Sequence, residues 1–296
     1  MSAPTIRRRD VAGGPDDVRA MQRLCERIWS RGTGWHIGDM AWGRFQHIGR
    51  EPEWPTAIWE RDGEVLAWAW VRLPGHLDLA VDPAYPDLAA EVMDWFPTVA
   101  TSDELAAGAL SNDTHLIAAF RAAGFTEAED VHRGTLSTHD LTDVSEPVVP
   151  DGFTVRHMRG PRDVERRVEV HRSAFEPSRV TPDSYANVMA AWPYRPDLDW
   201  VVEAPDGRFA ASCLVWWDAH NRVGELEPVG AHQDFRRMGL AGAACRAALR
   251  AVRDLGAAYA VVASVDSNEA SSHLYPSLGF RPYAVSVKYV RQRTPA

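Results

Sequence analysis

The sequence ELEPVGAHQDFRRMGLAG, residues 225–242, carries the strongest indication of the fold. It begins as a strand pattern, passes through a basic loop and leads at Gly239 into an alanine-rich helix pattern. A helix N-terminus presents free backbone N–H groups and the positive end of the helix dipole, and Gly239 has no side chain to hinder an approaching anion. The pattern is neither a P-loop nor a dinucleotide fingerprint. It predicts a phosphate-binding loop, with plain strand-to-helix packing as the alternative.

A second motif, NEASSHLYPSLGF, occupies residues 268–280 and follows an apolar strand pattern at residues 259–265. Asn268 is a typical helix N-cap. The two motifs, R-x-x-G-x-A after one strand and N-x-A-x-x-x-L-Y-x-x-L-G-F after the next, together resemble the GCN5-related N-acetyltransferase (GNAT) family. The resemblance covers the second half of the chain strongly and the first half weakly, so the whole chain is similar to a tandem-domain member of that superfamily.

The resemblance implies an N-acetyltransferase that uses acetyl-CoA and transfers the acetyl group directly to an amine of a small molecule or peptide. By similarity to the family, residues 237–242 hold the pyrophosphate and the backbone of residues 229–231 binds the pantetheine arm, near Asn268. Tyr275 matches the tyrosine that protonates the departing CoA thiolate, with aromatic packing under residues 279–280 as the alternative. The residues implied in acetyl-CoA binding are Val229, Gly230, Ala231, Arg236, Arg237, Met238, Gly239, Leu240, Ala241, Gly242, Asn268 and Tyr275.

The candidate general bases are Glu225 and Glu227. An amine must lose a proton before or during its attack on a thioester, so a base is expected near the reacting atoms. The two glutamates lie two residues apart on one strand and share a face, and carboxylates inside a sheet call for an explanation. The sequence leaves open which of them is the base. The alternative is that both line a solvated edge.

The chain contains an internal repeat at an offset of about half its length. Four pairs of similar segments recur, among them two hairpins with D-G turns at residues 62–63 and 206–207. The repeat predicts two tandem copies of one α/β fold, each with a mixed sheet. We expect them at residues 1–145 and 150–296, joined by a linker at residues 145–152.

The first copy departs from the family pattern where the phosphate loop should be. Pro86 has no N–H to donate, Asp87 would repel a pyrophosphate, and Leu88 has a side chain where Gly239 has none. Phe120 replaces the tyrosine. We therefore expect one acetyl-CoA per chain, in the second half, with the first half as a degenerate domain that serves as scaffold or as a wall of the acceptor site.

Local patterns in the second copy predict its elements. The predicted strands are residues 153–156, 200–203, 209–217, 222–229, 259–265 and 285–290, and the predicted helices are residues 161–174, 182–191, 239–255 and 268–278.

The composition indicates which binding partners and which cell compartment to expect. The net charge of -9 disfavours nucleic acid and suits an amine-bearing acceptor, and no apolar run is long enough to cross a membrane. Three scattered cysteines and the lack of a signal peptide favour the cytoplasm, and no histidine spacing suggests a metal. Oligomeric state, monomer or homodimer, stays open. The alternatives for function are a non-catalytic acyl-CoA-binding or regulatory protein and a transferase of a longer acyl group.

Overall fold

The structure is a computed structural model that describes residues 5–129 and 131–293. Within them, the strands form one 13-stranded mixed sheet in the order β1-β2-β3-β4-β5-β13-β7-β12-β11-β10-β9-β8, with β6 paired to β13. The strands are β1 (Arg7–Val11), β2 (Thr56–Arg61), β3 (Glu64–Arg72), β4 (His76–Val81), β5 (Glu104–Leu110), β6 (Thr126–Glu127), β7 (Gly134–His139), β8 (Thr154–His157), β9 (Asp199–Glu203), β10 (Phe209–Asp218), β11 (Val223–Ala231), β12 (Tyr259–Val265) and β13 (Arg281–Gln292). The helices are α1 (Pro15–Ile28), α2 (Ile37–Phe45), α3 (Leu88–Val99), α4 (Thr114–Ala122), α5 (Val164–Ala174), α6 (Pro182–Ala190), α7 (Leu240–Asp254) and α8 (Glu269–Ser277), with short 3-10 turns η1 (Glu51–Glu53), η2 (Pro161–Asp163), η3 (Pro196–Leu198) and η4 (Gln233–Phe235).

The predicted elements of the second half are confirmed, with ends displaced by a few residues. The predicted helix at residues 161–174 begins as the 3-10 turn η2, and β13 is longer than the predicted strand at residues 285–290. Both D-G hairpins are present, as β2–β3 and β9–β10. Gly63 and Gly207 have φ values of 82° and 85°, the left-handed region that these turns require.

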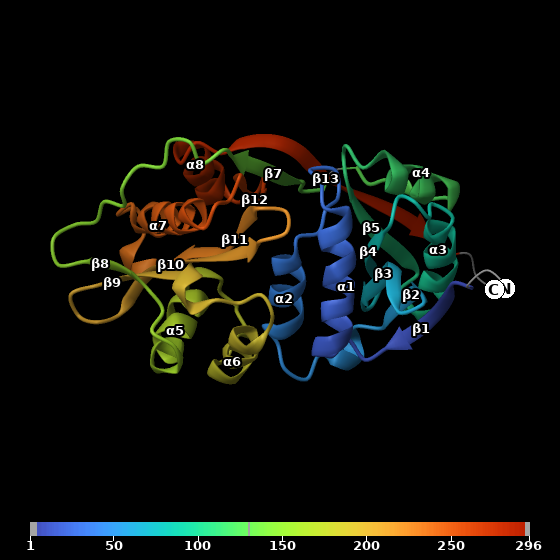
Figure 1. The fold of residues 1–296 in the computed structure, drawn as a ribbon, viewed down its shortest axis with the longest axis horizontal. Helices are drawn as coiled ribbons and strands as arrows, with labels where there is room; N and C mark the ends of the chain where they lie inside the picture. Colours follow the sequence, from blue (N-terminus) through green and yellow to red (C-terminus); the bar gives the residue numbers. More distant parts are fainter. Residues whose placement is uncertain (1–4, 130, 294–296) are drawn as a thin grey trace.

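The closing strands of the two halves are exchanged, which the sequence did not predict. Strand β7, from the first half, pairs with β12 of the second, and β13, at the end of the chain, pairs with β5 of the first (Figure 1). The two exchanged strands also pair with each other. The predicted linker at residues 145–152 does lie in coil between β7 and β8. The domain limits stay a prediction, since the sheet itself is continuous across the two halves.

Helices cover both faces of the sheet. In the second half α7 packs on β9, β10 and β11 over a core rich in alanine and valine, and α5 packs on the opposite face. Helix α2 belongs to the first half but contacts α6, β10 and β11 of the second (Figure 1). Its place between the halves brings the first-half side chain of Asp39 to Glu225 and Glu227 of β11.

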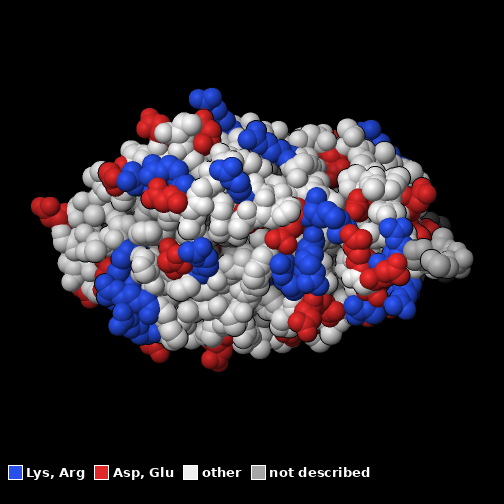
Figure 2. Space-filling view, in the orientation of Figure 1, with Lys and Arg blue, Asp and Glu red and all other residues white. Residues whose placement is uncertain are grey.

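Charged groups of both signs share the molecular surface. On the face drawn in Figure 2, positive and negative side chains are interspersed over both halves. That face offers no broad area of positive charge to a polyanion.

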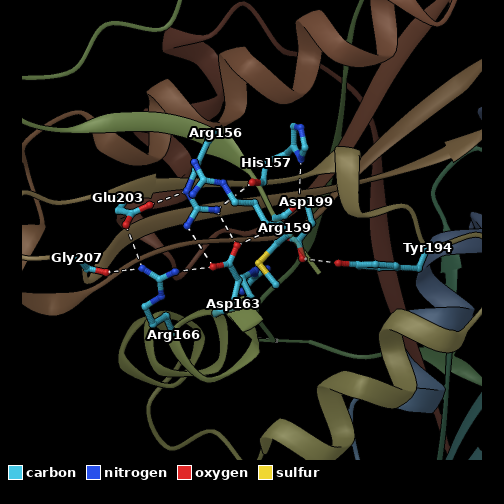
Figure 3. A network of polar contacts seen from close by, with 11 residues as sticks. Arg156, His157, Arg159, Asp163, Arg166, Tyr194, Asp199, Glu203 and Gly207 are labelled. Carbon is cyan, nitrogen blue, oxygen red and sulfur yellow. Dashed lines mark hydrogen bonds and ion pairs between the residues drawn. The ribbon is translucent and has the colours of Figure 1, made fainter. Parts of the chain in front are cut away.

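One dense ionic network ties α5 to the outer strands (Figure 3). Asp163 accepts hydrogen bonds from Arg156, at 2.7 Å, and from Arg166 and the backbone of Arg159. Glu203 on β9 accepts from Arg156 at 2.6 Å and from Arg166 at 3.0 Å. The network therefore joins β8, β9 and α5 in a structural role.

Candidate active site

The end of β11 has a free backbone edge. β11 pairs in parallel with β12 only at Val223, Gly224 and Glu225, whereas its antiparallel pairing with β10 continues to Ala231. Beyond Glu225 the edge that faces away from β10 has no strand partner in the described chain, so its N–H and C=O groups can bind an extended ligand. The predicted pantetheine-binding residues 229–231 lie there, and all three are half-buried.

The predicted phosphate loop lies next to that edge and leads into α7. Gly239 is the N-cap of α7 with φ 77°, and no side chain caps this helix end. A Cβ atom on Gly239 would meet nothing within 4 Å, and Arg236, Arg237 and Met238 are exposed. The first-turn amides are thus open to an anion, which fits a pyrophosphate. Leu240 and Gly242 are buried on the core side of the helix, and Ala241 is half-buried.

The second motif forms α8, as predicted. The Asn268 side chain caps α8 by accepting a hydrogen bond of 3.2 Å from the Ser271 N–H. Tyr275 is 8% exposed and meets Phe280 edge-on at 5.8 Å between ring centroids. Burial first, then the neighbouring Cys245, Cys213 and Glu227, raises the pKa of Tyr275 well above its usual range. Tyr275 therefore packs against Phe280, and its raised pKa keeps the phenol protonated at neutral pH.

Glu225 and Glu227 are not on a solvated edge. Glu225 is 6% exposed and Glu227 is half-buried. Both join Asp39 of α2 in a cluster whose carboxylate oxygens all lie within 4.8 Å of one another, which we call the acid cluster. A register shift in the β10–β11 pairing follows Cys213, opposite this part of β11, and bulges of this kind redirect side chains.

Burial raises the pKa of all three carboxyl groups well above their usual range. The Glu227 charge adds to the effect at Glu225, and the Asp39 charge adds to it at Glu227. At Asp39 the Glu225 charge adds to burial, while a hydrogen bond to Glu227 opposes it. The acid cluster can therefore hold protons near neutral pH and also attract a cation. Its oxygens would suit a metal ion as well as an ammonium group, so the expected lack of a metal stays a prediction.

The sequence missed Asp39 and its neighbour His36. His36 is the N-cap of α2 and Asp39 is at position N3, where it accepts the His36 N–H at 2.8 Å. His36 and Asp39 do not match the usual Ser/Thr-x-x-Glu/Gln pattern of a capping box, and even that pattern signals only the start of a helix. That the helix starts against Glu225 depends on how the two halves pack.

Gly38 allows the close approach of α2 to β10. A Cβ atom built on Gly38 would lie 2.3 Å from Cγ of Trp216, so only glycine fits. Trp216 in turn donates its indole N–H to the Glu227 carbonyl at 2.7 Å. These contacts fix the distance between Asp39 and the two glutamates.

The corresponding region of the first half differs. β4 and β5 pair only at His76–Ala106 and Leu77–Ala107, and a cavity of about 40 Å³ lies beyond this point. Leu88 is buried at the start of α3, and Phe120 packs on Tyr289 of the exchanged strand at 5.5 Å. A groove of about 390 Å³ between α3 and α4 includes Asp87 and Asp94 in its lining. These observations favour a first half without a phosphate loop, which stays a prediction.

The model of the Acetyltransferase (GNAT) family matches residues 166–280, a segment that contains the phosphate loop, the free edge of β11 and α8. The second half of the chain therefore contains a GNAT domain. Mycothiol acetyltransferase from Segniliparus rotundus is 31% identical over 159 residues, which are 49% of this chain and 58% of that protein. Mycothiol acetyltransferase from Thermomonospora curvata is 30% identical over 150 residues, 49% of each chain. The matches thus span only about half the length of these curated relatives.

Solved structures of the family share the whole fold. A tandem GNAT protein from the clavulanic acid biosynthesis pathway is 16% identical, with TM-score 0.66, and covers 99% of this chain and 100% of that one. A GCN5-related N-acetyltransferase from Sphaerobacter thermophilus is 18% identical, with TM-score 0.61. The match covers 98% of this chain and 96% of that one. The predicted tandem fold with its mixed sheet is confirmed. Among the described helices, none has the length and apolar character needed to cross a membrane.

Proposed function

We propose that this GNAT protein transfers the acetyl group of acetyl-CoA to the amine of a small molecule. The observation that carries the proposal is the juxtaposition of three features of one strand, β11: the buried acid cluster at Glu225 and Glu227, the free edge at residues 229–231 and the open phosphate loop after it. Together they offer sites for an amine, for an extended arm and for a pyrophosphate.

The donor side fits acetyl-CoA. Gly239 and the first-turn amides of α7 would hold the pyrophosphate with Arg236 and Arg237 nearby, and residues 229–231 would hydrogen-bond the arm. Bound acetyl-CoA supplies the thioester carbonyl that an amine attacks. Tyr275 keeps its proton because burial raises its pKa, so its phenol can protonate a departing thiolate. We infer one acetyl-CoA per chain, bound by the second half, residues 150–296.

The acceptor side fits a compact cation. The acid cluster attracts an ammonium group and can take up its proton, which frees the nitrogen lone pair for attack. Asp39 reaches the cluster from the first half, so both halves would form the acceptor site. Because Glu225 is buried in this cluster, a folded protein surface could not reach its carboxyl group, which favours a small amine. The names of the two curated relatives, both mycothiol acetyltransferases, also support a small-molecule acceptor.

Charge and cysteine chemistry support an inference about the partner and the compartment. The intermixed surface charge and the net charge of -9 favour an amine over nucleic acid as partner. The three cysteines are free and buried, which suits a reducing compartment such as the cytoplasm.

The test has two steps. Titration calorimetry measures the binding of acetyl-CoA, and an amine panel of amino sugars, amino acids and polyamines is then assayed for CoA release, with and without a chelator. We expect one acetyl-CoA to bind per chain and CoA to be released with at least one small amine. The chelator should not change the rate of CoA release. Binding without release from any amine would overturn the proposal in favour of a non-catalytic acyl-CoA-binding protein. Faster release from a longer acyl-CoA would overturn acetyl as the transferred group.

A further inference from the structure

His36 and Glu225 meet inside the protein, at the boundary between the two halves. Nδ1 of His36 lies 3.0 Å from Oε2 of Glu225, and the two side chains are 1% and 8% exposed. The same nitrogen lies 3.1 Å from the Gly38 backbone N–H, which donates to it. His36 comes from the first half and Glu225 from the second.

The contact requires a proton between the two groups. A ring nitrogen that accepts the Gly38 N–H carries a lone pair, and a carboxylate oxygen is also an acceptor. Two buried acceptors 3.0 Å apart repel each other unless one of them carries a hydrogen. The repulsion is removed when the Glu225 carboxyl is protonated and donates its O–H to His36 Nδ1, whose single lone pair it shares with the Gly38 N–H.

We propose that His36 and Glu225 share one proton and act as a unit, with His36 as the positioning residue that lets the buried Glu225 accept the proton of the amine. This inference rests on the acetyl-transfer function proposed above. It selects Glu225 as the base and leaves Asp39 and Glu227 to hold the ammonium group.

The proton transfer balances across the carboxyl group. The N–H bond of the ammonium breaks, its electron pair stays on nitrogen, and the proton goes to Oε1 of Glu225. The proton already on Oε2 moves to Nδ1 of His36, so the positive charge of the ammonium becomes that of an imidazolium. The proton then leaves to water before the next turnover, as the net reaction requires.

The surroundings of His36 suit this transient charge. Burial lowers the pKa of His36, which keeps it neutral at rest, while the nearby carboxylates of Asp39, Asp218 and Glu26 raise it. Burial and the Glu227 charge raise the pKa of Glu225, which favours its protonated form at rest. The backbone of Val223 also raises the pKa of His36, and the Trp29 ring lies edge-on to it at 5.2 Å. Protonation of Nδ1 costs the Gly38 hydrogen bond, so the imidazolium is short-lived.

The decisive variant is His36→Asn in the full chain. Asparagine is a good N-cap and so preserves the start of α2, but its amide cannot take up a proton. We expect kcat to fall by about 10- to 100-fold with KM for the amine unchanged, and the activity to shift to higher pH, where the amine is already deprotonated. Acetyl-CoA affinity should stay the same.

His139→Asn is the matched control. His139 is also buried, and its Nδ1 also accepts the N–H of the residue two positions on, at 2.8 Å, but its ring makes no ion pair within the described chain. We expect its kcat and pH profile to match the wild type. An unchanged kcat and pH profile in His36→Asn would overturn the proposal.

Nitrogen-15 NMR of His36 tests the contact without an assay of activity. We expect a neutral ring with the proton on Nε2 in the wild type, and a changed Nδ1 shift in Glu225→Met, which removes the shared proton. A proton on Nδ1 at rest, or a shift indifferent to Glu225→Met, would overturn the inference. If the wild type transfers acetyl to no amine, the proposed function fails, while the NMR result still decides whether the pair shares a proton.

Discussion

Gly239 combines two properties that the proposed phosphate loop needs. Its φ of 77° is left-handed, and the space beside its Cα is empty. In Gly239→Val the branched side chain would occupy the place proposed for the pyrophosphate, so we expect acetyl-CoA affinity to fall by at least about 100-fold. Calorimetric titration measures the change. Wild-type affinity in a folded variant would show that the loop does not bind the pyrophosphate.

Gly256, at the other end of α7, is the control. It too has a left-handed φ, 93°, and open space where a Cβ would be. Gly256→Val should therefore carry a similar backbone strain, about 1 kcal/mol or more, without loss of acetyl-CoA affinity. An equal loss of acetyl-CoA affinity in both variants would show that backbone strain, and not a blocked phosphate loop, causes the effect of Gly239→Val.

Tyr275 tests the acid of the reaction. In Tyr275→Phe only the hydroxyl is lost, and the edge-on contact with Phe280 remains possible. We expect kcat to fall by about 10²- to 10⁴-fold with acetyl-CoA affinity unchanged. Tyr289→Phe, at a buried tyrosine of β13 that packs in the core of the first half, should keep wild-type kcat. Stopped-flow or steady-state assays of CoA release measure kcat for both variants. Wild-type rates for Tyr275→Phe across the pH range would contradict its proposed role as the acid.

Helix α2 must pack closely on β10 for Asp39 to reach Glu225 and Glu227. In Gly38→Ala the new methyl group would meet Trp216 at 2.3 Å, so the helix or the indole must move. We expect a loss of about 1–3 kcal/mol in the free energy of unfolding and a lower kcat. Gly43→Ala on the same helix meets Trp70 at an ordinary 3.5 Å and should be nearly neutral. Denaturant unfolding of both variants makes the comparison, and equal stability would show that α2 tolerates displacement.

The α5 network predicts a pH dependence of stability. Burial raises the pKa of Asp163, but hydrogen bonds from Arg156, Arg159 and Arg166 outweigh it and lower the pKa to about 2. Because the folded pKa is depressed, the contribution is complete above about pH 4 and is lost as the pH falls toward 2. We expect Asp163→Asn to be less stable than the wild type by about 1 kcal/mol at neutral pH, after allowance for solvent screening, and the gap to close in acid. A gap that persists at low pH would contradict the prediction.

The sequence predicted those parts of the site that are contiguous in the chain. The phosphate loop and α8 each have their capping residue, strand and helix within about twenty residues, so local patterns suffice. Asp39 could not be found this way, because its partners lie on β11 and the contact depends on the packing of α2 across the two halves. The exchange of β7 and β13 could not be predicted either, since the pairing of β7 with β12 and of β13 with β5 joins residues more than one hundred positions apart in the sequence.

The strand exchange makes each half incomplete without the other. Val287 and Tyr289 of β13 belong to the core of the first half, and β13 pairs with β5 over residues 286–292. Strand β7 covers the edge of β12 in the second half from Ala260 to Val265. A chain cut between β7 and β8 therefore leaves each piece with a missing strand and a strand whose partner is absent.

Dividing the chain after residue 149 tests whether each half needs the exchanged strand of the other. Residues 150–296 expressed alone contain the whole predicted acetyl-CoA site, yet they lack β7 and expose the apolar side of β13, so we expect them to be insoluble or unfolded. Co-expression with residues 1–149 should restore a soluble complex, because both exchanged strands then find their partners, and with it the Asp39 contact and acetyl transfer. Size-exclusion chromatography, circular dichroism and the CoA-release assay measure the three properties. A folded, active fragment of residues 150–296 would show that the exchanged strands are dispensable and that the first half contributes nothing essential to the acceptor site.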